Sequence, residues 1–205
     1  MGDDAVAPGD PGLKRLCVFC GANAGRDPVY REAAQALGAL LAREGIGLVY
    51  GGASVGLMGA VADAACAAGG EVIGVIPRAL MKREIAHAGL SGLRVVGSMH
   101  ERKGLMAELA DGFIALPGGV GTLEELFEAW TWVHLGLHRK PCALLDVAGF
   151  YSRLVRFLDH VDGEGFLREG VRDMLLVERD PVRLLATMRA WRAPPAPAQL
   201  ARTET

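Results

Sequence analysis

The feature that most constrains the fold is an alternation of short apolar runs with longer stretches of helical periodicity. The apolar runs are LCVFC (16–20), GLVYG (47–51), EVIGVIP (71–77), RVVG (94–97), GFIALP (112–117), PCALLD (141–146) and MLLVE (174–178). Between them, a helical pattern covers Tyr30–Arg43, Leu57–Ala68, Met99–Ala110, Leu123–Leu135 and Phe150–His160. This alternation is typical of βαβ units. We therefore predict an α/β fold with a mostly parallel sheet flanked by helices.

Length and composition indicate a single globular domain. The chain has 205 residues, of which 51% are hydrophobic and 22% charged, as is ordinary for globular proteins. We expect one domain over 13–192 and disordered segments at 1–12 and 193–205, which lack periodicity. The net charge of −2, without a long basic run, argues against nucleic-acid binding. Neither a signal peptide nor a membrane span is predicted, so we expect a cytoplasmic protein that does not bind membranes.

The cysteine and histidine residues do not form a recognisable metal-binding pattern. Cys17 and Cys20 have C-x-x-C spacing, but they lie in an apolar run and no second pair completes a zinc set. The spacing of the histidines matches no ligand set either. We predict buried thiols and no metal site.

The glycine-rich turn after the second apolar run is a candidate phosphate site. GGASVGLMGA (51–60) opens a predicted helix, and its first residues, Gly51 and Gly52, would let backbone amides approach a phosphate. It lacks the G-K-[ST] ending of a P-loop and the G-x-G-x-x-G dinucleotide spacing. Close packing of helix against strand explains such glycines equally well.

The turn after the fourth run carries two cations at the start of a predicted helix. In S-M-H-E-R-K (98–103), Ser98 and Glu101 fit a capping box. Arg102 and Lys103 oppose the helix dipole, which disfavours cations at this end. A nearby anion would explain both residues.

The turn after the fifth run, PGGVGTLEE (117–125), is the most informative stretch of the chain. Gly118, Gly119 and Gly121 free the backbone to place its amides around an anion, and Thr122 adds a hydroxyl donor. Thr122 and Glu125 also satisfy T-x-x-E, so the spacing alone favours a capping role for Glu125.

The combination of these turns points to hydrolysis of a nucleotide's glycosidic bond. That bond breaks through an oxocarbenium-like transition state. A carboxylate can stabilise the positive charge that develops, or it can activate the attacking water. A cation can hold the phosphate or help the base to depart. Glu125 and Arg102 fit these two parts.

Paired with each other, M-H-E-R-K (99–103) and P-G-G-V-G-T-L-E-E (117–125) resemble the LONELY GUY family of cytokinin riboside 5′-monophosphate phosphoribohydrolases. The resemblance runs from about Leu16 to Phe166 and includes FCGA, DPVY, GLVYGG, VGLMG, IPRALM, TWVHLG and KPCALL. It implies a Rossmann-like, doubly wound sheet, no metal or organic cofactor, and a homodimer or larger assembly. It implies Arg102 and Glu125 as the catalytic pair, with substrate contacts from Glu84, Lys103, Thr131 and the glycine-rich turn Gly118, Gly119, Val120, Gly121, Thr122, Leu123 and Glu124. For Thr131 the alternative is a hydroxyl that bonds back within its own helix.

The sequence leaves the preferred substrate and the choice between two functions open. Ala22, Lys82 and Val120 depart from residues common in the family, which weakens any statement about the preferred base, so AMP and an N6-modified cytokinin nucleotide both stand as substrates. The alternative function is a carrier that binds a nucleotide or phosphorylated cofactor without cleaving it. We also expect helix Leu123–Leu135 to contribute to a dimer interface, because Trp130, Trp132 and Val133 add apolar surface to it.

Overall fold

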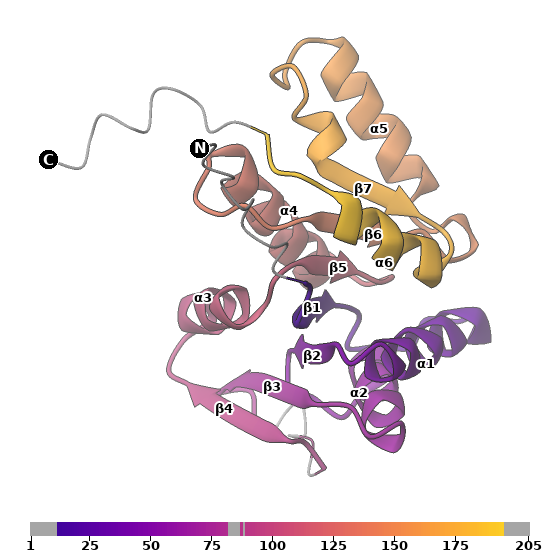
Figure 1. Cartoon of the computed structure of the whole chain (residues 1–205), viewed down its shortest axis with the longest axis vertical. Coiled ribbons are helices and arrows are strands. Elements are labelled where there is room, and N and C mark those ends of the chain that lie inside the picture. The colour runs from indigo at the N-terminus through magenta and orange to yellow at the C-terminus, as the bar shows by residue number, and fades with distance from the viewer. Residues whose placement is uncertain (1–11, 82–86, 88, 195–205) are drawn as a thin grey trace, which may run out of the picture.

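Seven strands form one parallel sheet in a computed structural model that describes residues 12–81, 87 and 89–194. All seven predicted apolar runs form strands, which are β1 (Arg15–Phe19), β2 (Gly47–Tyr50), β3 (Val72–Pro77), β4 (Gly92–Val96), β5 (Phe113–Ala115), β6 (Cys142–Leu145) and β7 (Leu175–Glu178). Their order is β4-β3-β2-β1-β5-β6-β7 (Figure 1). The predicted α/β class with a parallel sheet is confirmed.

The helices of the described residues include the five predicted ones and one more. They are α1 (Pro28–Arg43), α2 (Gly56–Ala67), α3 (Met99–Leu109), α4 (Val120–His134), α5 (Ser152–Gly163) and α6 (Pro181–Ala190), with short 3₁₀ turns at Val147–Gly149 and Arg172–Met174. Helix α4 begins three residues before the predicted Leu123, with Gly119 as its N-cap. The prediction lacked α6, although the side chain of Asp180 caps it at Arg183 N and Pro181 follows as its first residue.

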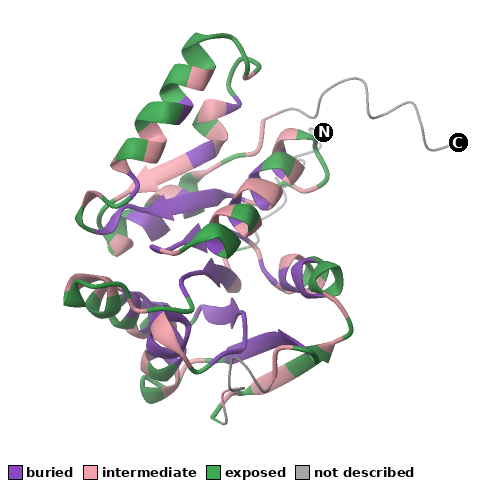
Figure 2. Ribbon diagram, turned by 180° about the vertical axis from the view of Figure 1, so that it is seen from behind, coloured by how far each residue is buried: buried purple, intermediate pink, exposed green. Residues whose placement is uncertain are grey.

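The helices cover both faces of the sheet, as a doubly wound fold requires (Figure 1). Helices α1, α2 and α6 pack in one apolar cluster with alternate residues of the strands, such as Leu16 and Leu48. Helices α3, α4 and α5 pack on the other face with residues such as Cys17 and Val49. Strands β1, β2, β3, β5 and β6 are therefore buried on both sides, and exposed residues gather on the outer helices and on β4 (Figure 2).

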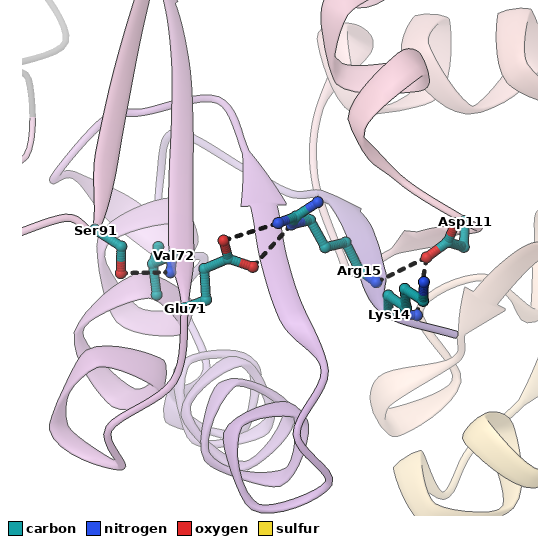
Figure 3. Close-up of polar contacts among 6 residues, drawn as sticks. All are labelled: Lys14, Arg15, Glu71, Val72, Ser91 and Asp111. Carbon is teal, nitrogen blue, oxygen red and sulfur yellow. Dashed lines mark hydrogen bonds and ion pairs between the residues drawn. The ribbon is translucent and has the colours of Figure 1, made fainter. Parts of the chain in front are cut away.

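Polar side chains hold the amino-terminal end of the sheet together (Figure 3). The carboxylate of Asp111 accepts hydrogen bonds from the backbone amides of Lys14 and Arg15 at 2.8 and 2.9 Å. The Arg15 side chain donates to Glu71, before β3, at 2.8 and 3.0 Å. This hydrogen bond raises the pKa of Arg15 and lowers the pKa of Glu71. The ends of β1, β3 and β5 are thus fixed away from the candidate site.

The order of the strands places a crevice at the opposite end of the sheet. The chain leaves β1 to build β2, β3 and β4 on one side, and then returns to build β5, β6 and β7 on the other. In open α/β sheets a ligand binds where the strand order reverses, outside the carboxyl ends of the strands. Here that point lies between β1 and β5.

Two further sequence predictions concern the ends of the chain and membrane-spanning segments. The terminal segments 1–12 and 193–205, predicted to be disordered, lie almost entirely outside the described residues. Within the part of the chain that is described, no helix has the length and apolar character needed to cross a membrane.

Candidate active site

A cavity of about 450 Å³ lies at the reversal point between β1 and β5. Its walls come from the turns after β1, β3, β5 and β6 and from the first turns of α1, α2, α3 and α4. The predicted site residues that line it are Arg102, Gly118, Gly119, Gly121, Thr122, Glu124 and Glu125. The structure therefore brings the two predicted catalytic residues and most of the glycine-rich turn into one cavity.

Arg102 is a buried cation held by backbone carbonyl groups. Its side chain is only 5% exposed. The Nε atom donates to the carbonyl of Val75 at 3.1 Å, and Nη2 donates to the carbonyl of Gly51 at 2.9 Å. These carbonyls lie on β3 and just after β2, so the ends of two strands orient the guanidinium. An arginine fixed in this way keeps its donor groups in one orientation.

Lys103, which follows Arg102 in the chain, contacts helix α4 instead of the cavity. It does not line the cavity, and its ammonium group contacts Glu124 at 2.5 Å and Glu128 at 3.0 Å, both on α4. Burial alone lowers the pKa of Lys103, but the two carboxylates more than offset this and raise it overall. The anions that accompany this cation belong to the protein, so Lys103 ties α3 to α4.

The first turn of α4 presents glycine backbone to the cavity. Among the described residues, a Cβ atom at Gly119 or Gly121 would meet nothing within 4 Å. At Gly118 it would overlap the side chain of Thr122, which is buried behind this turn. The backbone amides at this helix N-terminus, together with the helix dipole, are suited to an anion.

The capping explanation for Glu125 is wrong. Gly119 is the N-cap of α4 and makes no side-chain capping bond, so Thr122 lies inside the helix instead of before it. By contrast, the predicted cap of α3 is confirmed: Ser98 Oγ accepts from the amide of Glu101 at 3.1 Å. The carboxylate of Glu101 reaches the amide of Gly97 at 2.7 Å, one residue earlier than a standard capping box.

Glu125 is half-buried and, like Arg102, lines the cavity. Burial raises the pKa of the Cys20 thiol; the charge of Glu125 raises it further, and that of Arg102 lowers it. Both charges therefore act on the same cavity-lining thiol. Because the Cys20 thiol stays protonated, the charged side chains that line the cavity are Arg102, Glu124 and Glu125. Glu124 pairs with Lys103, so the catalytic candidates are Arg102 and Glu125.

The other predicted residues that the structure describes do not line the cavity. Gly51 and Gly52 are buried beside it, Val120 and Thr131 are exposed on α4, and Leu123 is half-buried on the same helix. Glu84 lies outside the described residues.

Several cavity residues had not been singled out from the sequence. The turn after β1 lines it from Cys20 to Gly25, and the side chains of Tyr30, Met58, Met99 and Phe150 add apolar walls. Gly21 donates to the carbonyl of Pro117 at 3.1 Å, which joins the turns after β1 and β5. The small residues of GANAG before the Asp27 cap of α1 were the available signal for this turn.

The thiols and the other candidate metal ligands are dispersed. Cys17, Cys20 and Cys142 are buried as predicted, whereas Cys66 is partly exposed, and all four are free. In the described ranges, no group of three or more His, Cys, Asp or Glu side chains is arranged to hold a metal ion.

Fold and cavity together define a Rossmann-like α/β protein with a candidate anion site at the reversal of its strand order. Comparison with known proteins gives the family. Residues 58–188 match the family model described as "Possible lysine decarboxylase". A cytokinin riboside 5′-monophosphate phosphoribohydrolase of Rhodococcoides fascians is 50% identical over 181 residues, covering 88% of this chain and 91% of the relative. The corresponding enzyme LOG7 of Arabidopsis thaliana is 52% identical over 164 residues, covering 80% and 76%. The chain belongs to this family, the LONELY GUY phosphoribohydrolases.

Solved structures of related fold include carriers. The molybdenum cofactor carrier protein of Chlamydomonas reinhardtii matches with a TM-score of 0.66 and 24% identity, covering 86% of this chain and 96% of that one. The molybdenum cofactor binding protein of Rippkaea orientalis matches with a TM-score of 0.63 and 23% identity, covering 86% and 95%. At this identity the likeness establishes the Rossmann-like fold alone.

Proposed function

We propose that this chain hydrolyses the N-glycosidic bond of adenine-type nucleoside 5′-monophosphates, releasing the free base and ribose 5-phosphate. The substrates would be cytokinin riboside 5′-monophosphates, AMP, or both. The observation that carries the proposal is the presence of Arg102 and Glu125 in one cavity with the open glycine-rich turn of α4. The proposal is supported by relatives about 50% identical over most of the chain, which are cytokinin riboside 5′-monophosphate phosphoribohydrolases.

In this proposal each group has a defined part. The amides around Gly119 and Gly121 hold the 5′-phosphate. The carboxylate of Glu125 faces the sugar, where it stabilises the positive charge that develops as the C1′–N bond breaks, or takes a proton from the attacking water. The water oxygen bonds to C1′, and the electron pair of the broken bond stays on the base, which gains a proton. Arg102 steadies the departing base or the phosphate.

The carrier alternative and lysine decarboxylation have less support. A carrier that leaves its ligand intact has no need for both a carboxylate and a buried arginine in the wall of one cavity. Lysine decarboxylation through a cofactor Schiff base would need a lysine at the site. No lysine of the described chain lines the cavity: Lys103 pairs with Glu124 and Glu128, and Lys140 donates to the carbonyl of Ala107 at 2.6 Å.

The test is product analysis with a matched pair of variants. Purified protein is incubated with AMP and with isopentenyladenosine monophosphate, and the free bases are separated by chromatography. We expect Glu125→Gln to lower kcat by roughly 10²–10⁴-fold, as loss of a group acting in the transition state does. Glu108→Gln, at an exposed position on α3, should match the parent protein. Binding of either nucleotide without release of base would favour the carrier function, and equal rates for both variants would contradict the role of Glu125.

We further infer a homodimer or larger assembly in the cytoplasm. Free buried thiols are typical of reducing compartments, which supports the location. Of the residues that suggested the interface, Trp130 and Val133 are buried in the chain's own core, and Trp130 donates to the carbonyl of Val171 at 3.1 Å. The apolar surface left near α4 comes from Val120, Leu135 and Leu137. Sedimentation as a monomer at micromolar concentration would contradict the assembly.

A further inference from the structure

The turn after β6 is closed by one buried carboxylate. Asp146 accepts from the backbone amide of Tyr151 at 2.7 Å, from Ser152 Oγ at 3.1 Å and from Arg179 Nε at 3.3 Å. Within the turn, Ala148 has a φ of 50°, in the left-handed region that residues other than glycine rarely adopt. A side chain with three partners and a strained backbone position together indicate a turn whose shape is tightly specified.

Tyr151, whose amide is held by Asp146, contacts the segment that leads into the glycine-rich turn after β5. The Tyr151 hydroxyl donates to the backbone carbonyl of Leu116 at 2.7 Å. Leu116 directly precedes Pro117 and Gly118, and its own amide donates to the carbonyl of Phe19 on β1 at 2.9 Å. The segment that leads into the glycine-rich turn is therefore fixed from both sides, by β1 through its amide and by Tyr151 through its carbonyl.

The turn after β6 also supplies a wall of the cavity. Phe150 lines it and meets Tyr30 edge to face, with ring centroids 5.8 Å apart. Phe150 also packs edge to face on Tyr151, at 4.9 Å. The contact between the β6 turn and the candidate site thus consists of one aromatic wall and one hydrogen bond.

A second buried tyrosine, Tyr50, offers a comparison for Tyr151, because its hydroxyl is buried but does not hold the glycine-rich turn. Tyr50, at the end of β2, and Tyr151 are both almost inaccessible to solvent. Burial raises the pKa of both phenols, so each keeps its proton at neutral pH. Within the described part of the chain the Tyr50 hydroxyl has no hydrogen-bond partner. The two phenols therefore differ in their hydrogen bonding: of the two, only the hydroxyl of Tyr151 holds the backbone that leads into the glycine-rich turn.

We propose that Tyr151 is a positioning residue that sets the backbone of Leu116–Gly118 and thereby aims the amides of the α4 N-terminus at the phosphate of the substrate. The inference rests on the proposed function for the identity of that phosphate. Asp146 acts one step further back, because its carboxylate fixes the amide of Tyr151. Neither residue contacts the reacting atoms in this account.

The experiment compares Tyr151→Phe with Tyr50→Phe, since each removes one buried hydroxyl and nothing else. We measure kcat and KM for the nucleotide, the competitive inhibition constant of inorganic phosphate, and the melting temperature. Tyr151→Phe should raise both KM and the phosphate inhibition constant by about tenfold, because a tenfold change corresponds to the contribution of about one hydrogen bond to binding. The value of kcat should stay within about twofold of the parent value. Tyr50→Phe should leave kcat, KM and the phosphate inhibition constant unchanged, and it should keep or raise the melting temperature, because the buried hydroxyl that it removes has no hydrogen-bond partner in the described part of the chain.

A purely structural role for Tyr151 would give a different pattern. If Tyr151→Phe lowers the melting temperature while KM and the phosphate inhibition constant stay at the parent values, the proposal is wrong. Asp146→Asn is the second variant: it keeps an oxygen acceptor for the Tyr151 amide, and it should raise KM in the same direction by a smaller factor. A normal KM in both variants would also overturn the proposal.

Direct calorimetry of phosphate binding separates this proposal from the function itself. If the parent protein releases no base from any nucleotide but binds phosphate more tightly than Tyr151→Phe does, the proposed hydrolysis fails and the positioning role stands. If the parent protein is active and both tyrosine variants bind phosphate equally, the positioning role fails and the hydrolysis stands.

Discussion

The glycine-rich turns after β2 and after β5 look alike in the sequence and differ in the folded protein. In the turn after β2 the glycines are covered by protein: a Cβ at Gly51 would overlap the guanidinium of Arg102, one at Gly56 the backbone of Ala22, and one at Gly59 the backbone of Ser54. In the turn after β5, Gly119 and Gly121 face open space among the described residues. The first turn uses glycine to let protein approach protein, and the second leaves backbone accessible to a ligand.

This difference assigns separate tasks to the two turns. The turn after β2 lets Arg102 reach the Gly51 carbonyl, so it acts on the site through the arginine. The turn after β5 lies in the cavity wall, so it acts on the ligand directly. Glycine spacing alone does not reveal which of these a turn does, because both need the absence of a Cβ atom.

The largest expected effect tests the turn after β5 by changing the substrate. AMP should be hydrolysed with a kcat/KM roughly 10²–10⁴-fold above that of adenosine, because each hydrogen bond to a charged group contributes about 1.5–3 kcal/mol and at least two are lost without the phosphate. Steady-state kinetics on both substrates measure the ratio. Equal values would show that the open turn does not bind a phosphate.

The second effect tests the turn after β2. In Gly51→Ala the added methyl group displaces the Arg102 guanidinium, so kcat should fall about 10²-fold, as small misplacements of catalytic groups do. Overpacking should also lower stability by about 1–3 kcal/mol. Phosphate inhibition should be nearly unchanged if Arg102 acts on the departing base, and it should weaken if Arg102 holds the phosphate. Gly104→Ala is the control, because Gly104 lies on the same helix as Arg102 with open space around it. An active Gly51→Ala variant would break the comparison.

The smallest effect concerns Gly121, in the first turn of α4. Gly121→Ala should raise stability by about 0.5–1 kcal/mol, because alanine loses less backbone entropy in a helix. The same methyl group should crowd the phosphate and weaken phosphate binding by about tenfold, which corresponds to the loss of roughly one charge-assisted hydrogen bond. Thermal melts and phosphate inhibition measure both. A variant with unchanged phosphate affinity would show that Gly121 does not face the ligand.

The fold was largely predictable from the sequence because each strand of a parallel sheet is a short apolar run. The order of the strands was not predicted, since periodicity shows which segments are strands and says nothing of which ones pair. Helix α6 was missed because it is short, although Asp180 and Pro181 mark its start. The start of α4 was placed three residues late because Gly121, a poor helix former, lies in its first turn.

The site was predictable where a motif coincides with a turn, and less so where it depends on long-range packing. Arg102 and Glu125 were singled out and line one cavity. The cations of α3 were expected to face an external anion, but Lys103 meets Glu124 and Glu128, which are distant in the sequence. The contact of Tyr151 with Leu116 spans 35 residues and left no local pattern to detect.

The central position of β1 bears on how the chain is made. Its partner on one side, β2, follows soon, but its other partner begins at Phe113, which pairs with Cys17. At about 5–20 residues per second, a ribosome needs roughly 5–20 s to add the intervening ~100 residues. During that interval one edge of an apolar strand is unpaired, as in an aggregation-prone intermediate. Newly made chains should therefore depend on chaperones most strongly before β5 emerges.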